Sequence, residues 1–309
     1  MKFGGTSVAN ATNINKVIDI VLESAKQTEK IVVVSALSGI TDDLVKLATS
    51  SFEKDFGYKI IFESLCQRHN QLIQELIVEN DKENVILEVN KKYSELEEIL
   101  KNIKIKDDLV KRISLSSLDA VMSFGEQLSA LIISKAFKSR GVLCEFIDAR
   151  NIVKTDENFG SANVDIEKSY KLIADCFKNK SLSVLGGFIG STLSGQTTTL
   201  SRGGSDYTAS LVGAALDASV IEIWTDVDGI MTEDPKKMKD ALLIPEITYE
   251  KAEEMAYNGA KVIHPKTIRP AVLKNIPIYV KNTFNPNGSG TRISNPSSGA
   301  KLTTGQVKI

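Results

Sequence analysis

Histidine and cysteine are scarce in this chain of 309 residues, which has two of the first and three of the second. Cys66, Cys144 and Cys176 are widely separated and form no C-x-x-C pair. This spacing argues against a zinc site or a disulfide framework and is typical of a reducing compartment. His69 lies in a polar helical stretch and His264 precedes a proline, so we expect both to be structural. The chemistry must therefore depend on lysine, arginine, carboxylates and backbone amides.

The chain also lacks long apolar runs and an excess of charge of one sign. Its longest apolar runs, such as 31–34, have the length of a strand, so none can span a bilayer. With 38 Lys and Arg against 39 Asp and Glu, the formal net charge is -1, which gives no general attraction to nucleic acid or anionic membranes. Charged residues interrupt the first thirty positions, which excludes a signal peptide. These absences predict a cytoplasmic protein with neither nucleic acid nor a membrane as its partner.

Common nucleotide-binding signatures are missing as well. The sequence has no G-x-x-x-x-G-K-[ST] motif, which excludes a P-loop enzyme. No H-R-D motif occurs, so the set of H-R-D and D-F-G motifs that marks protein kinases is incomplete. No G-x-G-x-x-G follows a predicted strand with an acidic residue beyond it, so dinucleotide binding is not supported.

Short apolar runs alternate with amphipathic stretches along most of the chain. The stretch 42–110 is rich in Glu, Lys and Leu and predicts two or three amphipathic helices without a strand. Residues from Asn285 onward are rich in Gly, Pro, Ser and Asn and predict a linker or terminal arm rather than core. Further strands are predicted at 31–35, 143–147, 182–185, 220–224 and 276–280, and further helices at 13–23, 118–137 and 207–216.

This alternation predicts an α/β protein, a three-layer α/β/α sandwich with a mostly parallel central sheet. In such folds ligands bind beyond the carboxyl ends of the strands, in the loops that lead into helices. The junctions between strands and loops are therefore where functional residues are expected, and four of them stand out.

The first junction is the opening of the chain, MKFGGTSVAN. Lys2 precedes the pair Gly4 and Gly5, which allow the backbone to approach a ligand closely. Thr6 and Ser7 add hydroxyl groups at the start of a helix, where anions can bind. A cation, close backbone amides and hydroxyls suit a phosphate. The same stretch is also typical of an ordinary strand-to-helix turn, and on these residues alone the ordinary turn is the favoured interpretation.

The second junction, SALSGIT, follows the predicted strand at 31–35. Thr41 is predicted to cap the next helix, with Asp42 and Asp43 stabilising its first turn. The two acids need no role beyond that. Ser35 and Thr41 are also candidates to bind a substrate, because both lie where a strand ends.

The third junction, TTTLSRGGSDYTAS, combines an arginine with two glycines. A strand is predicted to end at Leu200, and a helix of small residues follows. Arg202 offers a planar guanidinium group that suits a carboxylate or a phosphate. Asp206 can cap the helix, but a helix cap does not explain an exposed arginine beside two glycines. This junction is the most informative of the four.

The fourth junction, IWTDVDGIMTEDP, carries several acidic residues after a predicted strand. Asp226, Asp228 and Asp234 suggest calcium, but the glycine and glutamate of an EF-hand loop are not at the required positions. Thr225 and Asp226, a hydroxyl and an acid at the end of a strand, can instead hold a ribose or an adenine edge. Downstream, Lys261 begins a helix in GAKVIHPKT. A lysine there is usually solvated, whereas beside a nucleotide it would face phosphates.

Taken together, these junctions resemble the aspartate kinases of the amino-acid-kinase fold, which is also that of carbamate kinase. The resemblance covers nearly the whole chain, and an ordered set of motifs is far more specific than any one of them. The stretches SVANA and EIWTDVDG look like the kinase portion of bifunctional aspartate kinase–homoserine dehydrogenases. The motifs are KFGGTS at 2–7, SALSGIT at 35–41, MSFGE at 122–126, GGFIGS at 186–191, SRGGSD at 201–206, WTDVDGI at 224–230 and GAKVIHP at 259–265.

The resemblance implies an enzyme that transfers the γ-phosphoryl group of ATP to the β-carboxylate of L-aspartate, the first step toward lysine, threonine and methionine. Such a transfer depends on positioning and on positive charge around the phosphoryl oxygens, and a carboxylate nucleophile needs no strong general base. By resemblance, Lys2 would face the migrating phosphoryl group, Gly4 and Gly5 would supply backbone amides, and Lys261 would lie near the ATP phosphates. Mg²⁺ is expected mainly on ATP oxygens and water, so no metal ligands are assigned.

The same resemblance implies that the amino acid is held between two charged side chains. Arg202 would bind its α-carboxylate, and Glu126 would bind its α-ammonium group. Asp206 would orient Lys2 and the reacting groups. The hydroxyl groups that would add hydrogen bonds to the substrate are those of Ser35, Thr41 and Ser205.

The family's nucleotide contacts fall on Thr225 and Asp226. Three positions depart from the family's pattern. Ser201 replaces a glycine common before the arginine, Met231 occupies a position often held by tyrosine, and Lys236 one often held by arginine. These departures concern the detail of the contacts with adenosine and phosphate.

The resemblance also implies a domain organisation. Residues 1–293 would form the kinase domain, with the amino acid bound by the part up to about 190 and the nucleotide by the remainder. Residues 294–309 would be a linker toward regulatory domains that normally follow the kinase core. We expect a homodimer that is weaker without those domains, and no inhibition of this chain by lysine or threonine.

Two alternatives to aspartate phosphorylation stay open. The chain could act on the substrate of another enzyme with the same fold, such as glutamate, acetylglutamate, carbamate or a nucleotide monophosphate. The pairing of Glu126 with Arg202, for both ends of a free amino acid, disfavours acetylated and nucleotide substrates. The chain could also be an amino-acid-binding regulatory module without catalysis, which the presence of Lys2, Asp206 and Lys261 together disfavours.

Overall fold

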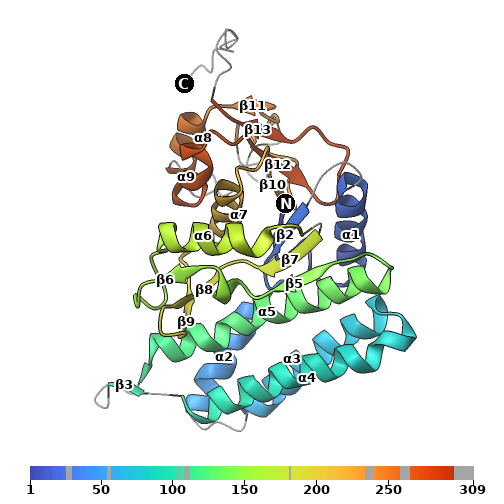
Figure 1. Cartoon of the computed structure of the whole chain (residues 1–309), viewed down its shortest axis with the longest axis vertical. Coiled ribbons are helices and arrows are strands. Elements are labelled where there is room, and N and C mark those ends of the chain that lie inside the picture. The colour runs from blue at the N-terminus through green and yellow to red at the C-terminus, as the bar shows by residue number, and fades with distance from the viewer. Residues whose placement is uncertain are drawn as a thin grey trace.

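The structure is a computed structural model of the chain (Figure 1). No helix within the part of the chain that it describes has both the length and the apolar character needed to cross a membrane. The described residues are 1–25, 30–53, 57–103, 105–107, 112–180, 182–233, 238, 240–257 and 265–295.

An eight-stranded sheet forms the centre of the molecule. Neighbouring strands in the described residues are parallel, apart from the last hairpin, in which the strands at Ile278–Asn282 and Thr291–Ile293 are antiparallel. This arrangement confirms the predicted mostly parallel sheet. From edge to edge the sheet runs β11 (Glu246–Ile247), β13 (Thr291–Ile293), β12 (Ile278–Asn282), β10 (Ile221–Thr225), β1 (Lys2–Phe3), β2 (Lys30–Val34), β7 (Leu182–Gly186) and β5 (Glu145–Ile147).

Helices cover both faces of this sheet, which confirms the predicted three-layer α/β/α sandwich. One face is covered by α1 (Ala11–Ala25), α2 (Ile40–Phe52), α3 (Gly57–Leu76), α4 (Glu79–Lys101) and α5 (Leu115–Ser139). The other is covered by α6 (Ile166–Phe177), α7 (Gly204–Ala215), α8 (Tyr249–Tyr257) and α9 (Pro265–Leu273). In Figure 1, α2 to α5 lie together at the bottom of the picture, and α8 and α9 lie at its top left.

The sequence 42–110 forms three helices, α2 to α4, as its amphipathic pattern predicts. The prediction that it contains no strand is wrong, because the short strand β3 (Ile105–Asp107) pairs antiparallel with β4 (Arg112–Ile113). A strand of three residues that alternates Ile, Lys and Asp carries too little apolar pattern to be recognised from sequence.

Alternation along the strands explains how the two apolar cores form. Val32 and Val34 pack in the core on the side of α1 to α5, whereas Val33 packs in the core on the side of α7. Successive side chains of a strand point to opposite faces of the sheet. Phe3 belongs to the first core and stacks on Trp224 with 5.8 Å between the ring centroids. Lys2 therefore points to the other face, where α7 begins.

A second, three-stranded sheet lies beside α5 and leads into α7. It consists of β6 (Lys154–Thr155), β8 (Ile189–Thr192) and β9 (Thr197–Thr199), with β6 parallel and β9 antiparallel to β8. β9 ends one residue before the predicted strand end. The preceding 3-10 helix η1 (Ala149–Asn151) is tied to this sheet by polar contacts.

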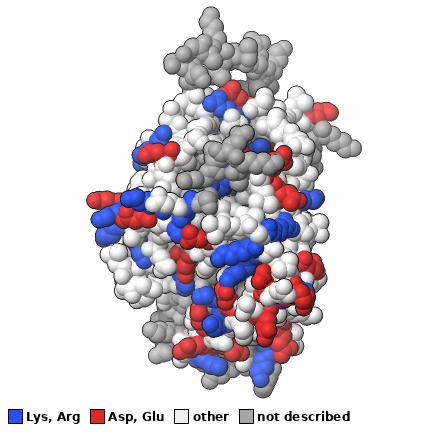
Figure 2. Space-filling model, turned by 45° about the vertical axis from the view of Figure 1, so that its right-hand side comes forward, with Lys and Arg blue, Asp and Glu red and all other residues white. Residues whose placement is uncertain are grey.

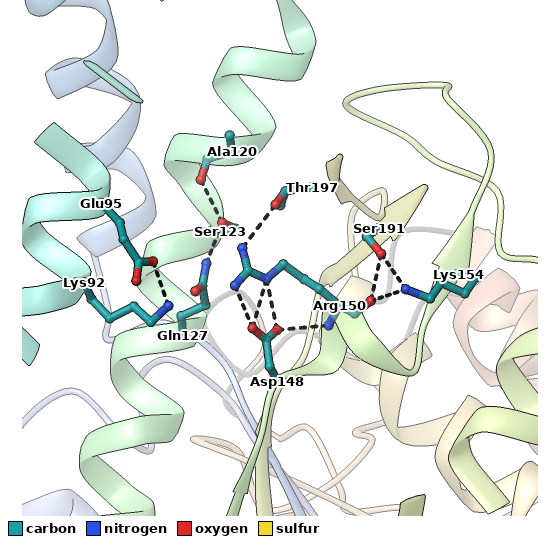
Figure 3. Close-up of polar contacts among 10 residues, drawn as sticks. All are labelled: Lys92, Glu95, Ala120, Ser123, Gln127, Asp148, Arg150, Lys154, Ser191 and Thr197. Carbon is teal, nitrogen blue, oxygen red and sulfur yellow. Dashed lines mark hydrogen bonds and ion pairs between the residues drawn. The ribbon is translucent and has the colours of Figure 1, made fainter. Parts of the chain in front are cut away.

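Figure 3 shows these contacts around Arg150. The Arg150 guanidinium group pairs with the Asp148 carboxylate and donates a hydrogen bond to Thr197 Oγ1 at the start of β9. Lys154 Nζ donates to the backbone oxygen of Arg150 and to Ser191 Oγ. These bonds fix η1, β6, β8 and the first residue of β9 as one unit beside α5.

The segment from Asn285 to 295 is not a linker, which corrects the sequence-based expectation. β13 closes the large sheet, and its residues Thr291 and Ile293 are fully buried. Thr291 Oγ1 accepts a hydrogen bond from the Ile230 amide and donates one to the Ile244 oxygen. The Gly, Pro and Ser residues of this segment form the turn before β13, whereas the strand itself depends on partners distant in sequence. The rest of the predicted tail lies outside the described residues.

Candidate functional site

A cavity of about 380 Å³ lies at the carboxyl ends of β1, β2 and β7, between the first turns of α2 and α7 and the middle of α5. This is the edge of a parallel sheet at which ligands bind in α/β folds. The structure brings together here many of the residues that the sequence singled out. The predicted site residues that line the cavity are Lys2, Gly5, Ser35, Thr41, Glu126, Ser205 and Asp206.

Lys2 and Asp206 form an ion pair inside the cavity. Lys2 Nζ lies 2.7 Å from Asp206 Oδ1, and both side chains are almost completely buried. The backbone of β1 directs Lys2 toward α7, and the first turn of α7 directs Asp206 back toward β1. The two residues are in direct contact, while the role of Asp206 in orienting Lys2 for a reaction stays a prediction. The ammonium group is thus held at one position in the cavity.

Glu126, on α5, supplies another buried carboxylate to the lining of the cavity. Only 4% of the residue is exposed, and Oε2 has no hydrogen-bond partner among the described residues. Burial raises the pKa of Glu126 from 4.5 to about 8, against the opposing effect of a backbone hydrogen bond from Ala36. A buried carboxylate with a free oxygen is expected to attract a cationic group of a ligand.

Close packing fixes the backbone at Glu126. A Cβ atom at Gly186, the last residue of β7, would lie 2.8 Å from Glu126 Cβ and 2.9 Å from its backbone oxygen. A Cβ at Gly125 would lie 2.8 Å from Ala36 Cβ. Only glycine at these two positions allows α5 to approach the ends of β2 and β7 so closely.

Two helix N-termini, those of α2 and α7, face the cavity. Both helices are preceded by a glycine in the left-handed conformation, Gly39 with φ 83° and Gly203 with φ 79°, and neither has a side-chain cap. The expected capping roles of Thr41 and Asp206 are therefore wrong, because both residues lie inside their helices. The uncapped N–H groups and the positive ends of the two helix dipoles favour an anion in this cavity.

Ser35 and Ser205 connect the end of β2 to the start of α7. Ser35 Oγ donates a hydrogen bond of 3.1 Å to Ser205 Oγ. Both hydroxyls line the cavity with Thr41, so the predicted substrate hydroxyls lie together.

Phe188 is a cavity residue that the sequence reasoning did not select. Its backbone has φ 65°, which is strained for an aromatic residue. Two hydrogen bonds hold this conformation, one from the Phe188 amide to Thr208 Oγ1 and one from the Leu200 amide to the Phe188 oxygen. The signal in the sequence was the motif GGFIG, in which flanking glycines indicate an unusual turn, but they do not identify which residue is strained. Ser38 and Asp42 also line the cavity and were not selected as substrate ligands.

Arg202 does not line the cavity, unlike the other residues that the sequence predicts to bind the amino acid. It is exposed and lies in the loop between β9 and α7, directly before Gly203, which does line it. A guanidinium group on a long side chain at this position can reach the mouth of the cavity.

Among the expected nucleotide residues, Gly5 lines the cavity, whereas Gly4, Thr225, Asp226 and Met231 are not part of its lining. The Gly4 amide donates a hydrogen bond of 3.1 Å to the Trp224 oxygen, which places the glycine pair next to Thr225 at the end of β10. Thr225 Oγ1 donates to the exposed carboxylate of Asp226. Met231 forms an isolated bridge with Leu243. Lys236 and Lys261 lie outside the described residues.

A second cavity, of about 320 Å³, lies at the opposite, amino-terminal ends of the strands. Its lining includes Lys30, Ser219 and Glu222 and contains none of the predicted site residues. Charges elsewhere on the surface are mixed in sign. On the face drawn in Figure 2, the basic and acidic groups of the described residues are interspersed.

The sequence of the chain is similar to those of known proteins. A model of the amino acid kinase family matches residues 1–282. The chain is 40% identical over 306 residues to lysine-sensitive aspartokinase 3 of Escherichia coli (strain K12), a match that covers 97% of this chain and 65% of that protein. It is 33% identical to the chloroplastic bifunctional aspartokinase/homoserine dehydrogenase 2 of Arabidopsis thaliana, covering 96% of this chain and 32% of that protein.

Among solved structures, E. coli aspartokinase III in complex with aspartate and ADP superposes with a TM-score of 0.86 at 35% identity. That match covers 96% of this chain and 64% of the other. The chain thus spans less than two thirds of the length of these relatives. The fold, the cavity at the ends of β1, β2 and β7, and the match to the family model over most of the sequence lead to one conclusion: this chain belongs to the amino acid kinase family.

Proposed function

We propose that this chain transfers the γ-phosphoryl group of ATP to the β-carboxylate of L-aspartate. The observation that carries the proposal is the buried carboxylate of Glu126, whose Oε2 has no hydrogen-bond partner among the described residues, in a cavity that also contains Lys2 and two uncapped helix N-termini. One cavity thus offers a site for a cation beside sites for anions. A free amino acid with a second carboxylate has this distribution of charge.

In the proposed complex, Glu126 accepts hydrogen bonds from the α-ammonium group of the substrate. Arg202 and the amide groups at the start of α7 bind the α-carboxylate, and the hydroxyls of Ser35, Thr41 and Ser205 add hydrogen bonds. The β-carboxylate then lies toward Lys2. Binding at both ends of the amino acid orients it for reaction, and such orientation lowers the barrier to group transfer.

The reaction itself needs little from the protein beyond positioning and charge. One oxygen of the β-carboxylate attacks the γ-phosphorus, and the bond from that phosphorus to the oxygen bridging the β-phosphate breaks, so ADP leaves with the bonding electron pair. The nucleophile carries no proton, so no general base is required. Lys2, held by Asp206, would stabilise the negative charge on the transferring group.

Gly4 and Gly5 fit a phosphate beside Lys2. A Cβ atom at Gly4 would lie 3.7 Å from Lys2 Nζ, so its absence leaves the space next to the ammonium group open. Mg²⁺ bound mainly through ATP oxygens would neutralise phosphate charge. Thr225, Asp226, Met231, Lys236 and Lys261 are proposed as the further contacts with ATP.

The proposal extends to the remaining expectations from the sequence. Residues 1–293 would form the catalytic domain, the protein would act in the cytoplasm, and it would associate as a homodimer. The relatives support the substrate assignment, since one of them was solved in complex with aspartate and ADP.

An assay of ATP turnover tests the proposal. ADP formation is measured with Mg²⁺ and L-aspartate, L-glutamate or N-acetyl-L-glutamate, and the acyl phosphate is trapped with hydroxylamine. We expect turnover and hydroxamate formation with L-aspartate, and loss of both without Mg²⁺. Preference for glutamate or acetylglutamate would reassign the substrate. Binding of aspartate without any turnover would favour a regulatory module instead.

A further inference from the structure

Asp119 is a buried carboxylate on α5 that lies outside the cavity and contacts no proposed ligand. It is fully buried, and its two oxygens accept three hydrogen bonds from the residues that the structure describes. Oδ2 accepts from the amides of Gly160 (2.8 Å) and Thr199 (3.0 Å), and Oδ1 accepts from Thr199 Oγ1 (2.6 Å). Burying a carboxylate is costly unless its oxygens are satisfied, so this carboxylate is a strong and specific anchor for its donors.

Two of the three bonds hold the last residue of β9. β9 is an edge strand of the three-stranded sheet, because on its side away from β8 no strand of the described ranges pairs with it. At Thr199 this free edge is satisfied by other groups: the amide donates to Asp119, and the backbone oxygen accepts from the Ala162 amide. Asp119 thus accepts the hydrogen bond that a neighbouring strand would otherwise accept, and it fixes the end of β9 against α5.

Asp119 is linked along the chain to both residues that are proposed to bind the two ends of the amino acid, Arg202 and Glu126. Arg202 follows Thr199 by three residues in the loop that enters α7. Glu126 follows Asp119 by seven residues on α5, about two helical turns along the same face. Asp119 therefore joins the helix that carries Glu126 to the strand that delivers Arg202.

We propose that Asp119 is a positioning residue that sets the distance between Arg202 and Glu126 and so determines how tightly the amino acid is bound. The inference rests on the proposed function, in which these two side chains bind the α-carboxylate and the α-ammonium group. It concerns affinity for the amino acid, and it leaves Lys2 and the phosphoryl-transfer step unaffected.

The chain provides a matched pair of variants to test this. Thr199→Val removes the hydroxyl bonded to Asp119 but retains the Thr199 amide. Thr198→Val is the control: Thr198 is the preceding residue of β9, is equally buried, and its Oγ1 bonds to Thr155 Oγ1 (2.8 Å), away from α5. Both variants lose one buried hydrogen bond through the same substitution, so a general loss of stability affects both alike.

Variants of Asp119 itself extend the test. Asp119→Ala removes all three bonds. Asp119→Asn keeps the shape, because its amide oxygen can accept from both amides while its NH₂ group donates to the Thr199 hydroxyl. Steady-state kinetics give kcat, the KM for aspartate and the KM for ATP of each variant, and thermal unfolding reports which of them are folded.

We expect Thr199→Val to raise the KM for aspartate by about fivefold and Asp119→Ala by about 30-fold, since small displacements of a substrate-positioning group have effects of this order. The kcat and the KM for ATP should change by less than about threefold, and Thr198→Val and Asp119→Asn should resemble the unmodified protein. In an Arg202→Ala background, Thr199→Val and Asp119→Ala should add less than about twofold, because their effect acts through the arginine.

Other outcomes overturn the inference. Equal effects of Thr199→Val and Thr198→Val on the KM for aspartate would show that Asp119 only stabilises the fold, and full additivity with Arg202→Ala would show that it does not act through the arginine. Should Asp119→Ala fail to fold, the two threonine variants still decide between these outcomes. Failure of the proposed function is distinguishable, because the unmodified protein itself would then not phosphorylate aspartate, and the inference would fall with it.

Discussion

Lys2 Nζ lies 2.7 Å from Asp206 Oδ1 at the carboxyl end of β1, and each residue is only 9% exposed. An ion pair taken out of water gains little net stability, because desolvation offsets most of the attraction between the charges. The ion pair lies in the cavity that the N-termini of α2 and α7 face, and this position instead suits a role in binding and catalysis. In the proposed function, the pair would hold a cation where negative charge develops during phosphoryl transfer.

The first prediction concerns Lys2→Ala. We expect kcat to fall by about 10²-fold or more while the dissociation constant of ATP changes by less than about threefold, because the lysine charge acts mainly on the transition state. Steady-state kinetics and calorimetry of ATP binding measure the two quantities. Lys46→Ala is the control, since Lys46 is an exposed lysine on α2 whose ion pair within the described part of the chain is with Asp43. A loss confined to ATP affinity would remove Lys2 from the role proposed for it.

Arg202→Ala is expected to act on the amino acid instead. The arginine is exposed in the structure and would be paired by the substrate carboxylate, so its truncation should raise the KM for aspartate by an amount equivalent to about 2–4 kcal/mol. The KM for ATP should stay nearly constant. Arg269→Ala, at an exposed position on α9, should leave both constants unchanged. An equal rise in both KM values would contradict a specific contact with the amino acid.

Much of the fold could be predicted because its apolar pattern is local. The runs that became β2 and β7, and the periodic stretches that became α1 and α5, are recognisable without their partners. β13 was missed for the opposite reason. Thr291–Ile293 follows a turn of Gly, Ser and Asn, and it is a strand because it pairs with β12 and because Thr291 bonds to residues 230 and 244. A short strand held by distant partners leaves little trace in its own sequence.

In the candidate site, too, some features could be recognised from the local sequence and others depend on distant residues. Lys2 and Asp206 were selected at predicted junctions between strands and helices, and Glu126 was selected only through the resemblance of MSFGE to the aspartate kinases; all three line one cavity. The helix caps were misassigned because Thr41 and Asp206 have the right chemistry for capping, whereas the structure uses the left-handed backbone of Gly39 and Gly203. The strain at Phe188 depends on bonds to Leu200 and Thr208 and could not be inferred from residue type.

Close packing at Gly187 leads to a third prediction. A Cβ atom there would lie 2.6 Å from Ser205 Cα and 2.7 Å from Ser205 Cβ, so Gly187→Ala must displace the first turn of α7. We expect a loss of about 1–3 kcal/mol in the free energy of unfolding, as for other overpacked sites, together with a higher KM for aspartate.

The control for this variant is Gly195→Ala. Gly195 has φ 88° and nothing within 4 Å of the added Cβ, so the variant tests left-handed backbone strain without overpacking. It should lose about 1–2 kcal/mol of stability and keep its affinity for aspartate. If Gly187→Ala binds aspartate as tightly as Gly195→Ala does, Ser205 and the start of α7 do not contribute to the substrate site.

The buried carboxylate of Glu126 predicts two pH effects of opposite sign. Its pKa of about 8 means that it is mostly protonated at pH 6.5 in the free protein, and binding of an α-ammonium group requires the ionised form. The kcat/KM for aspartate should therefore rise by about tenfold per pH unit below pH 8 and level off above it. A flat profile between pH 6 and 8 would contradict the assignment of Glu126 to the ammonium group.

Folding stability should change in the other direction. Because the pKa of Glu126 is raised from 4.5 to about 8 in the folded protein, its contribution to stability is complete below pH 4.5 and is lost as the pH rises to about 8. Glu126→Gln keeps the shape without the ionisation, so its Tm should exceed that of the unmodified protein by several degrees more at pH 8.5 than at pH 5. Glu98→Gln, at an exposed position on α4, should show no such difference between the two pH values. An equal Tm difference for Glu126→Gln at both pH values would mean that Glu126 is ionised across this range. The burial of the Glu126 carboxylate would then be no argument for a cation-binding site in the cavity.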